Sequence, residues 1–219
     1  MNHKKVLNKV LAGKEIKKDE ALFLLKNTRL DDLLKGSLKI KVENKLDDFE
    51  FCSIINAKSG NCSENCKFCA QSSFYDTDVE TYDLLPYEKI FKKERKNQEQ
   101  GIEYFSLVTT GKGIKNEQTF DKICKIIKKL KDELEIKICA SLGIISKPKL
   151  KRLKSIGLDR YHHNLETSKN HYKKICTTHS YEERLETIKN AKDIGLEVCS
   201  GGLIGLGEEE SDFLDLAFL

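Results

Sequence analysis

Three cysteines lie close together in the sequence, as Cys62, Cys66 and Cys69, with the spacing C-x3-C-x2-C. Cysteine thiolates are the usual ligands of iron–sulfur clusters, and three of them can hold a [4Fe–4S] cluster by three of its irons, which leaves the fourth iron open. A structural zinc ion is the alternative, but such a site closes with four ligands. No histidine or cysteine occurs in the dozen residues that follow Cys69. The triplet therefore predicts an iron–sulfur centre.

Polar side chains alternate with apolar ones in three segments with strand character, 135–142, 159–165 and 196–203. Successive side chains of a strand point to opposite faces. The polar face, with its continuation just beyond the second segment, carries Lys137, Cys139, Ser141, Arg160, His162, Asn164, Glu166, Glu197, Cys199 and Gly201. Strands of an open sheet covered on both faces are apolar on both sides. The pattern favours a barrel with a functional polar interior, and the alternative is an interior whose polar groups only satisfy one another.

Strands and helices are expected to alternate along the chain. Expected strands are 51–58, 103–109, 135–142, 159–165 and 196–203, and expected helices are 87–100, 117–132, 147–155, 181–194 and one from Glu208 onward. Glycine follows three of these helices, and Ser180 with Glu183 forms a capping box for a fourth. This alternation predicts parallel strands joined by right-handed crossovers, so the fold class is α/β.

A (β/α) barrel of the TIM type has eight strands and about 250 residues. The 219 residues of this chain hold five expected strands, so we expect the first five strands of an incomplete, C-terminally truncated barrel. Amphipathic patterns in residues 4–36 predict two or three short helices before it. The expected domains are an N-terminal helical extension, 1–45, and the barrel core, 46–219.

Composition limits the function classes. The chain has 39 Lys+Arg against 35 Asp+Glu, a net charge of +4 that argues against nucleic-acid binding. It contains no run of roughly 18 apolar residues that could span a membrane, and no secretory signal is visible near the N-terminus. The eight cysteines are then expected to be reduced, in the cytoplasm.

Several segments resemble the biotin synthase family of the radical S-adenosylmethionine (SAM) superfamily. The triplet with Phe68 before its last cysteine matches the superfamily. The segments that match the family are 56–60 (NAKSG), 69–72 (CAQS), 161–168 (YHHNLETS), 177–181 (TTHSY) with Arg184, and 199–202 (CSGG). The order and spacing agree over nearly the whole chain, although members of the family continue further.

The resemblance implies an enzyme that inserts sulfur into dethiobiotin through 5′-deoxyadenosyl radicals. It implies that Cys62, Cys66 and Cys69 bind the [4Fe–4S] cluster that generates the radicals. Residues expected at SAM are Phe68, Glu166, Arg184 and Gly201, and Asn164 is expected at the ureido ring of dethiobiotin. Flavodoxin or ferredoxin is the expected electron donor, and a homodimer is the expected assembly.

The inserted sulfur comes, in that family, from an auxiliary iron–sulfur cluster held by three cysteines and an arginine. Cys139 and Cys199 match two of these cysteines, but Ser106 stands at the position of the third. Serine is a harder and weaker iron ligand than a thiolate. The auxiliary cluster is therefore a [2Fe–2S] centre with Ser106 as a tentative ligand, a variant with other ligands, or absent.

Two other functions remain open on the sequence. Ser106 favours another radical SAM barrel enzyme without a sacrificial cluster, and the five-strand count favours an inactive iron–sulfur-binding fragment. Of the remaining cysteines, Cys52 and Cys124 are expected to be small core residues, and Cys176 is a candidate variant ligand.

Overall fold

A computed structural model describes residues 2–46 and 49–219. The chain divides into two compact units. One comprises the N-terminal segment up to Phe49 together with Glu208–Leu219, and the other spans Glu50–Gly207. The second unit holds all the residues for which chemistry is expected.

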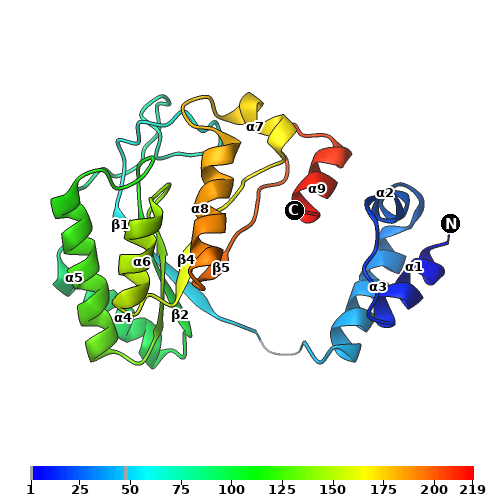
Figure 1. The fold of residues 1–219 in the computed structure, drawn as a ribbon, viewed down its shortest axis with the longest axis horizontal. Helices are drawn as coiled ribbons and strands as arrows, with labels where there is room; N and C mark the ends of the chain where they lie inside the picture. Colours follow the sequence, from blue (N-terminus) through cyan, green and yellow to red (C-terminus); the bar gives the residue numbers. More distant parts are fainter. Residues whose placement is uncertain (1, 47–48) are drawn as a thin grey trace. The chain divides into compact units, whose positions relative to one another are not determined.

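Five parallel strands form one sheet in the order β1-β2-β3-β4-β5 (Figure 1). They are β1 (Cys52–Lys58), β2 (Tyr104–Thr109), β3 (Lys137–Ser141), β4 (Arg160–His162) and β5 (Glu197–Cys199). Sequential order with parallel pairing is the arrangement of consecutive strands in a (β/α) barrel. The predicted α/β class and the five strands of a partial barrel are confirmed.

Helices cover one side of this sheet, which we call its outer face. They are α4 (Tyr87–Glu99), α5 (Glu117–Glu133), α6 (Lys147–Ser155) and α8 (Tyr181–Asp193). The strand residues packed against them in the hydrophobic core, Phe105, Leu107, Ile138, Ala140 and Tyr161, have 0% exposure. Helix α5 contributes a buried stripe that includes Leu130 and, as predicted, Cys124. Truncating such a leucine to alanine destabilises a protein by about 2–5 kcal/mol.

The opposite side, which we call the inner face, carries the polar row. Ser106 pairs with Cys139, and Cys139 pairs with Arg160. Because side chains alternate along each strand, these residues face away from the helices. Strand β1 alternates in the same way: Ala57 is buried toward the helices, whereas Cys52 and Ile54 are exposed. The prediction that Cys52 is a core residue is wrong.

The last two strands are shorter than expected. Their pairing continues without regular strand geometry, since His163 N–H donates to the Cys199 carbonyl (3.0 Å) and Leu165 N–H donates to the Gly201 carbonyl (3.0 Å). Glu166 has a φ of 71°, which is outside extended backbone, and only an isolated parallel bridge to Gly202 remains there. The chain bends at the point where these two segments reach the candidate site.

The other helices are α1 (His3–Leu11), α2 (Lys18–Asn27), α3 (Leu30–Glu43), α7 (Lys169–Ile175) and α9 (Glu210–Ala217). Three N-terminal helices agree with the expected two or three, and α7 was not predicted. The Ser180–Glu183 capping box at the start of α8 is present. No helix in the described part of the chain is long and apolar enough to cross a membrane.

Helix α4 buries an acidic side chain, which gives a test of the fold. Glu94 has 0% exposure, its oxygens make no hydrogen bond of standard geometry among the described residues, and burial raises its pKa to about 8. The carboxyl of the unfolded chain ionises near pH 4.5, so the folded state loses stability as the pH rises from 4.5 to 8.

Glu94→Leu should therefore stabilise the chain more at pH 8 than at pH 5. The expected difference is on the order of 2–4 kcal/mol, from about 1.4 kcal/mol per pKa unit. Urea unfolding at both pH values, followed by circular dichroism, measures it. Glu88→Leu, at an exposed position of the same helix, is the control and should leave the pH dependence unchanged. An equal gain at both pH values for Glu94→Leu would contradict the account.

Candidate functional site

The cysteine triplet lies in the loop that follows β1, at the carboxyl end of the sheet, where barrel enzymes carry their chemistry. The loop folds back on itself through backbone hydrogen bonds. Cys62 N–H donates to the Gln71 carbonyl (2.9 Å), and Ser73 N–H donates to the Cys62 carbonyl (2.9 Å). A third bond, from Cys69 N–H to the Cys66 carbonyl (3.0 Å), forms the tight turn between the last two cysteines.

A turn at Gly60 fixes where this loop begins. Gly60 has a φ of 73°, and a Cβ built there would lie 2.1 Å from Thr81 Oγ1. Gln71 Oε1 accepts hydrogen bonds from Gly60 N–H (2.6 Å) and from the Ser59 hydroxyl (3.1 Å). Both ends of the loop are therefore tied together by one amide side chain.

A cavity of ≈ 260 Å³ is lined both by the cysteine loop and by residues at the carboxyl ends of the strands. Its lining includes Cys62, Cys66, Phe68, Cys69, His162, Asn164, Glu166 and Arg184. These are the expected ligands of the radical-generating cluster, most of the expected SAM contacts and the expected substrate contact. Gly201 lies beside the cavity, with Asn164 Oδ1 3.9 Å from the place of a Cβ. A larger depression of ≈ 800 Å³ over α7 and the start of α8 contains none of the three motif cysteines.

Arg184 is the central cation of this cavity. Its Nη1 lies 3.4 Å from Glu166 Oε1 and donates to the Asn164 carbonyl at 2.6 Å, while its Nε donates to the Tyr172 hydroxyl at 2.8 Å. Burial raises the pKa of Glu166, and the Arg184 charge opposes that shift. The positive charge of Arg184 thus partly offsets the cost of burying the Glu166 carboxylate in the wall of the cavity.

His162 determines the orientation of the Asn164 amide. His162 Nε2 and Asn164 Oδ1 are 3.1 Å apart. When the ring nitrogen carries the proton it donates to this oxygen, so the amide nitrogen of Asn164 is the end that donates to the Glu166 carboxyl and lowers its pKa. The predicted inward direction of His162 and Asn164 agrees with their place in the lining.

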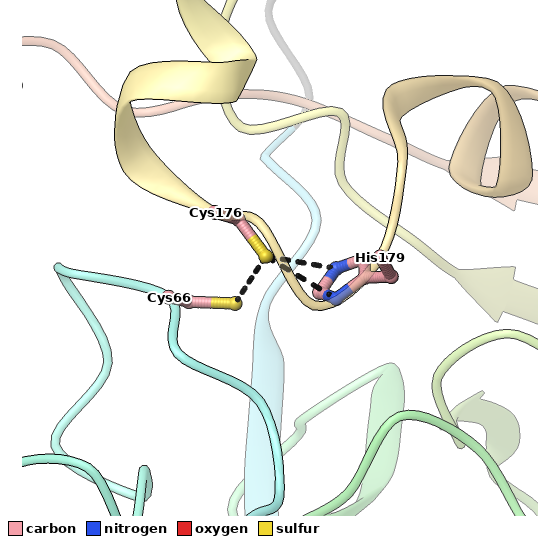
Figure 2. Close-up of side chains that lie close together, drawn as sticks. All are labelled: Cys66, Cys176 and His179. Atoms are coloured by element: carbon pink, nitrogen blue, oxygen red, sulfur yellow. Dashed lines mark hydrogen bonds between the residues drawn. The ribbon is translucent and has the colours of Figure 1, made fainter.

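A second sulfur, that of Cys176, lies next to the Cys66 sulfur (Figure 2). Cys176 Sγ lies 3.6 Å from Cys66 Sγ and 3.3 Å from His179 Nδ1, and all three residues are buried. Glu64 Oε2 approaches His179 Nδ1 at 2.6 Å. Cys176 was a candidate from the sequence, whereas His179 and Glu64 were missed, although they lie in the TTHSY segment and between the first two motif cysteines.

The protonation of this group follows from its surroundings. Burial lowers the pKa of His179 and outweighs the raising effect of Glu64; the Arg184 charge lowers it further. Burial raises the pKa of Glu64, but hydrogen bonds from Thr178, His179 and Ser63 bring it below its usual value. A neutral His179 that donates from Nδ1 to the Glu64 carboxylate can accept from Arg184 Nε (3.2 Å) at Nε2.

The donor set fits an iron–sulfur cluster with one open iron. Burial raises the pKa of the Cys62 and Cys66 thiols, and a metal ion replaces the protons of such buried thiols on binding. The three thiols face a cavity that has room for a further ligand and whose lining includes the charged side chains of Glu166 and Arg184. This open arrangement differs from the closed four-ligand shell of structural zinc.

Cys139 and Cys199 lie on the inner face of the sheet, as their alternation predicted. Cys139 is 5% exposed, and burial raises its pKa to about 12. Its register partner Ser106 is 6% exposed, and the Ser106 hydroxyl has no hydrogen bond of standard geometry within the described residues. Cys199 pairs with His162, one step closer to the cavity.

Comparisons with known proteins agree with this arrangement. The sequence profile of the Radical SAM superfamily matches residues 57–219. The chain is 50% identical to a biotin synthase of Clostridium perfringens over 213 residues, 97% of this chain and 66% of that protein. It is 46% identical to a biotin synthase of Campylobacter hominis over 218 residues, 100% of this chain and 67% of that protein. The chain thus spans about two thirds of the length of these curated relatives.

Two solved structures share the fold. Methylornithine synthase (PylB) superposes with a TM-score of 0.82 at 20% identity, over 96% of this chain and 62% of that one. HydG, a maturase of the [FeFe]-hydrogenase, superposes with a TM-score of 0.79 at 20% identity, over 98% of this chain and 49% of that one.

The sulfur–sulfur contact in Figure 2 leads to a redox prediction. When Cys66 is an iron ligand its sulfur can only accept, so any hydrogen bond along the 3.6 Å contact is donated by the Cys176 S–H. Hydrogen bonds to cluster sulfurs raise the reduction potential. Cys176→Ala should lower the midpoint potential of the reconstituted cluster by roughly 20–60 mV, the equivalent of one hydrogen bond.

An anaerobic titration followed by electron paramagnetic resonance (EPR) measures this shift. Cys176→Ser keeps a donor and should shift the potential less, and Cys124→Ala, on the outer side of the fold, serves as the control. An unchanged potential in Cys176→Ala would show that the Cys176 thiol does not donate to the cluster.

Proposed function

Because the chain belongs to the radical SAM superfamily, and within it to the biotin synthase family, we propose that it takes part in the conversion of dethiobiotin to biotin. The observation that carries this proposal is the single cavity that contains Cys62, Cys66 and Cys69 together with Asn164, Glu166 and Arg184. Cluster ligands and polar groups suited to SAM and a cyclic urea are thus within reach of one another.

Cys62, Cys66 and Cys69 would hold the [4Fe–4S] cluster in this proposal. When bound, the reduced cluster supplies the electron that splits SAM into methionine and a 5′-deoxyadenosyl radical. The surrounding protein keeps the thiols on one short loop, closed by the Cys62–Gln71 and Ser73–Cys62 backbone bonds. It also keeps Cys66 away from bulk water, since that residue is 7% exposed.

SAM would occupy the cavity between the loop and the strand ends. Glu166 would accept hydrogen bonds from the ribose hydroxyls, and Arg184 would face the carboxylate of SAM while it stabilises Glu166 in its ionised form. Phe68 adds an aromatic surface in the lining. Gly201 carries no side chain that would obstruct the nucleoside, and its carbonyl anchors Leu165 and Glu166.

Dethiobiotin would bind at Asn164. A ureido ring offers both donors and an acceptor, which match the two ends of a carboxamide. The contact of His162 with Asn164 Oδ1 sets which end of that amide faces the ligand. Two hydrogen atoms would be removed from the substrate. Each would be taken up by a separate 5′-deoxyadenosyl radical, so two molecules of 5′-deoxyadenosine would form.

The sulfur would come from an auxiliary iron–sulfur cluster, [2Fe–2S] or a variant of it, on the inner face of the sheet. Cys139 and Cys199 are the proposed thiolate ligands, and Ser106, beside Cys139, is the tentative third ligand. When bound, this cluster supplies the sulfur atom that bridges the two substrate carbons.

The remaining parts of the proposal follow from the family. The electron donor would be flavodoxin or ferredoxin, the assembly a homodimer, and the location the cytoplasm. The division into an extension, 1–45, and a barrel core, 46–219, also remains a proposal. The second candidate function is a radical SAM reaction without sulfur insertion, which the serine at position 106 favours.

The two functions differ in their products. The anaerobically reconstituted chain, given reductant, SAM and dethiobiotin, should form 5′-deoxyadenosine and biotin, both detected by mass spectrometry. Cys139→Ala should abolish biotin and leave SAM cleavage, because Cys139 faces the inner side and is absent from the lining of the radical-site cavity. Cys69→Ala should abolish both products, and Cys124→Ala should change neither.

Deoxyadenosine without biotin from the unmodified chain would support the second candidate. Unchanged biotin in Cys139→Ala would refute a sulfur source at that residue.

A further inference from the structure

Cys52 lies on the inner face of the sheet, at the first position of β1. Its side chain points to the same face as those of Ile54 and Asn56, which are exposed. Ala57 points to the opposite face and is fully buried against the helices. Ile54 is the register partner of Ser106. Cys52 is the preceding inner-face residue of β1, two residues before Ile54. The sulfur therefore faces the same side as Ser106, from the adjacent strand.

The strand register places three free cysteines on the inner face. Cys52 pairs with Tyr104, two residues before Ser106 on β2, and Cys139 pairs with Ser106. Cys199 pairs with His162, two residues beyond Arg160, which is the partner of Cys139. Strands β1, β3 and β5 thus each direct one free thiol to the same face of the sheet.

A cation adjoins this space. The Arg160 guanidinium lies 3.7 Å from the centroid of the Tyr104 ring, and it pairs with Glu197 and with Glu50. Its charge lowers the pKa of both Cys52 and Cys139, against the effect of burial. A positive charge at this place favours an anionic ligand set of thiolates.

Ser106 is the weaker donor for iron at the same place. Its hydroxyl is buried beside the Cys139 thiol, and its hydrogen bond to that sulfur lowers the pKa of Cys139 against the effect of burial. A neutral hydroxyl binds iron less well than a thiolate does. Of the other cysteines, Cys124 is buried in α5 and Cys176 lies next to Cys66, so neither reaches the inner face.

We propose that Cys52 provides the third thiolate of the auxiliary iron–sulfur site, together with Cys139 and Cys199. This inference rests on the proposed function, because it names the ligand set of the cluster that would donate sulfur. Cys52 of β1 would thus supply the thiolate that Ser106 of β2 cannot supply. Ser106 then lines the site without having to ligate iron.

The test removes the radical site so that only the inner-face site can bind. A Cys62→Ala/Cys66→Ala/Cys69→Ala background is reconstituted anaerobically with iron and sulfide. Iron and acid-labile sulfide per chain and the Mössbauer spectrum are then measured. The background should retain a bound cluster. Adding Cys52→Ala should reduce its iron at least threefold, as should Cys139→Ala, whereas adding Cys124→Ala should not reduce it.

A rescue variant separates ligation from a general disturbance of the fold. Cys52→Ala/Ser106→Cys, in the same background, keeps three thiols on the inner face and should recover the lost iron. Because Cys52 is exposed in β1, its replacement by alanine leaves the core intact. Equal folding of all variants is checked by thermal unfolding.

Two results would overturn the inference. One is an unchanged iron content and Mössbauer spectrum in Cys52→Ala, and the other is a background that binds no iron. The proposed function fails on a different observation, the absence of 5′-deoxyadenosine from the unmodified chain. The iron measurement does not depend on that product, so the two failures are distinguishable.

Discussion

The alternation of side chains along five parallel strands is the constraint on which this structure depends. One parity packs Phe105, Ile138 and Tyr161 against the helices, and the other parity directs Ser106, Cys139 and Arg160 inward. A one-residue shift of any strand would exchange these two sets. The same hydrophobic packing that folds the sheet therefore determines which thiols and charged groups share the inner face.

At the carboxyl ends of the strands, the cavity contains buried charged and polar groups that stabilise one another. Arg184 contacts Glu166, Asn164, Tyr172 and His179, so one guanidinium connects the strand β4 segment with α7 and the loop before α8. Buried charges persist where they are paired and hydrogen-bonded. The partners of Arg184 are therefore in place before any ligand binds.

The sequence was sufficient to predict the strands and four of the helices behind them, because periodicity and local spacing encode them. Alternation also put Asn164 and Glu166 on one face, whereas a site shared with the cysteine triplet was implied by the resemblance to the biotin synthase family. Helix α7 was missed, since its seven residues carry too short a pattern. The contact of Cys66 with Cys176 joins residues 110 positions apart and leaves no local signal. Cys52 was misplaced because β1 mixes polar and apolar residues on both parities, so alternation alone could not orient it.

The central claim is that the cysteine loop and the strand-end residues form one site in which SAM contacts the open iron of a cluster. Electron–nuclear double resonance of the reduced, reconstituted chain with SAM labelled with ¹⁵N at its amino group tests this directly. The account predicts a ¹⁵N coupling to the cluster that is lost in Cys69→Ala. A reduced cluster with SAM present and no ¹⁵N coupling would contradict it.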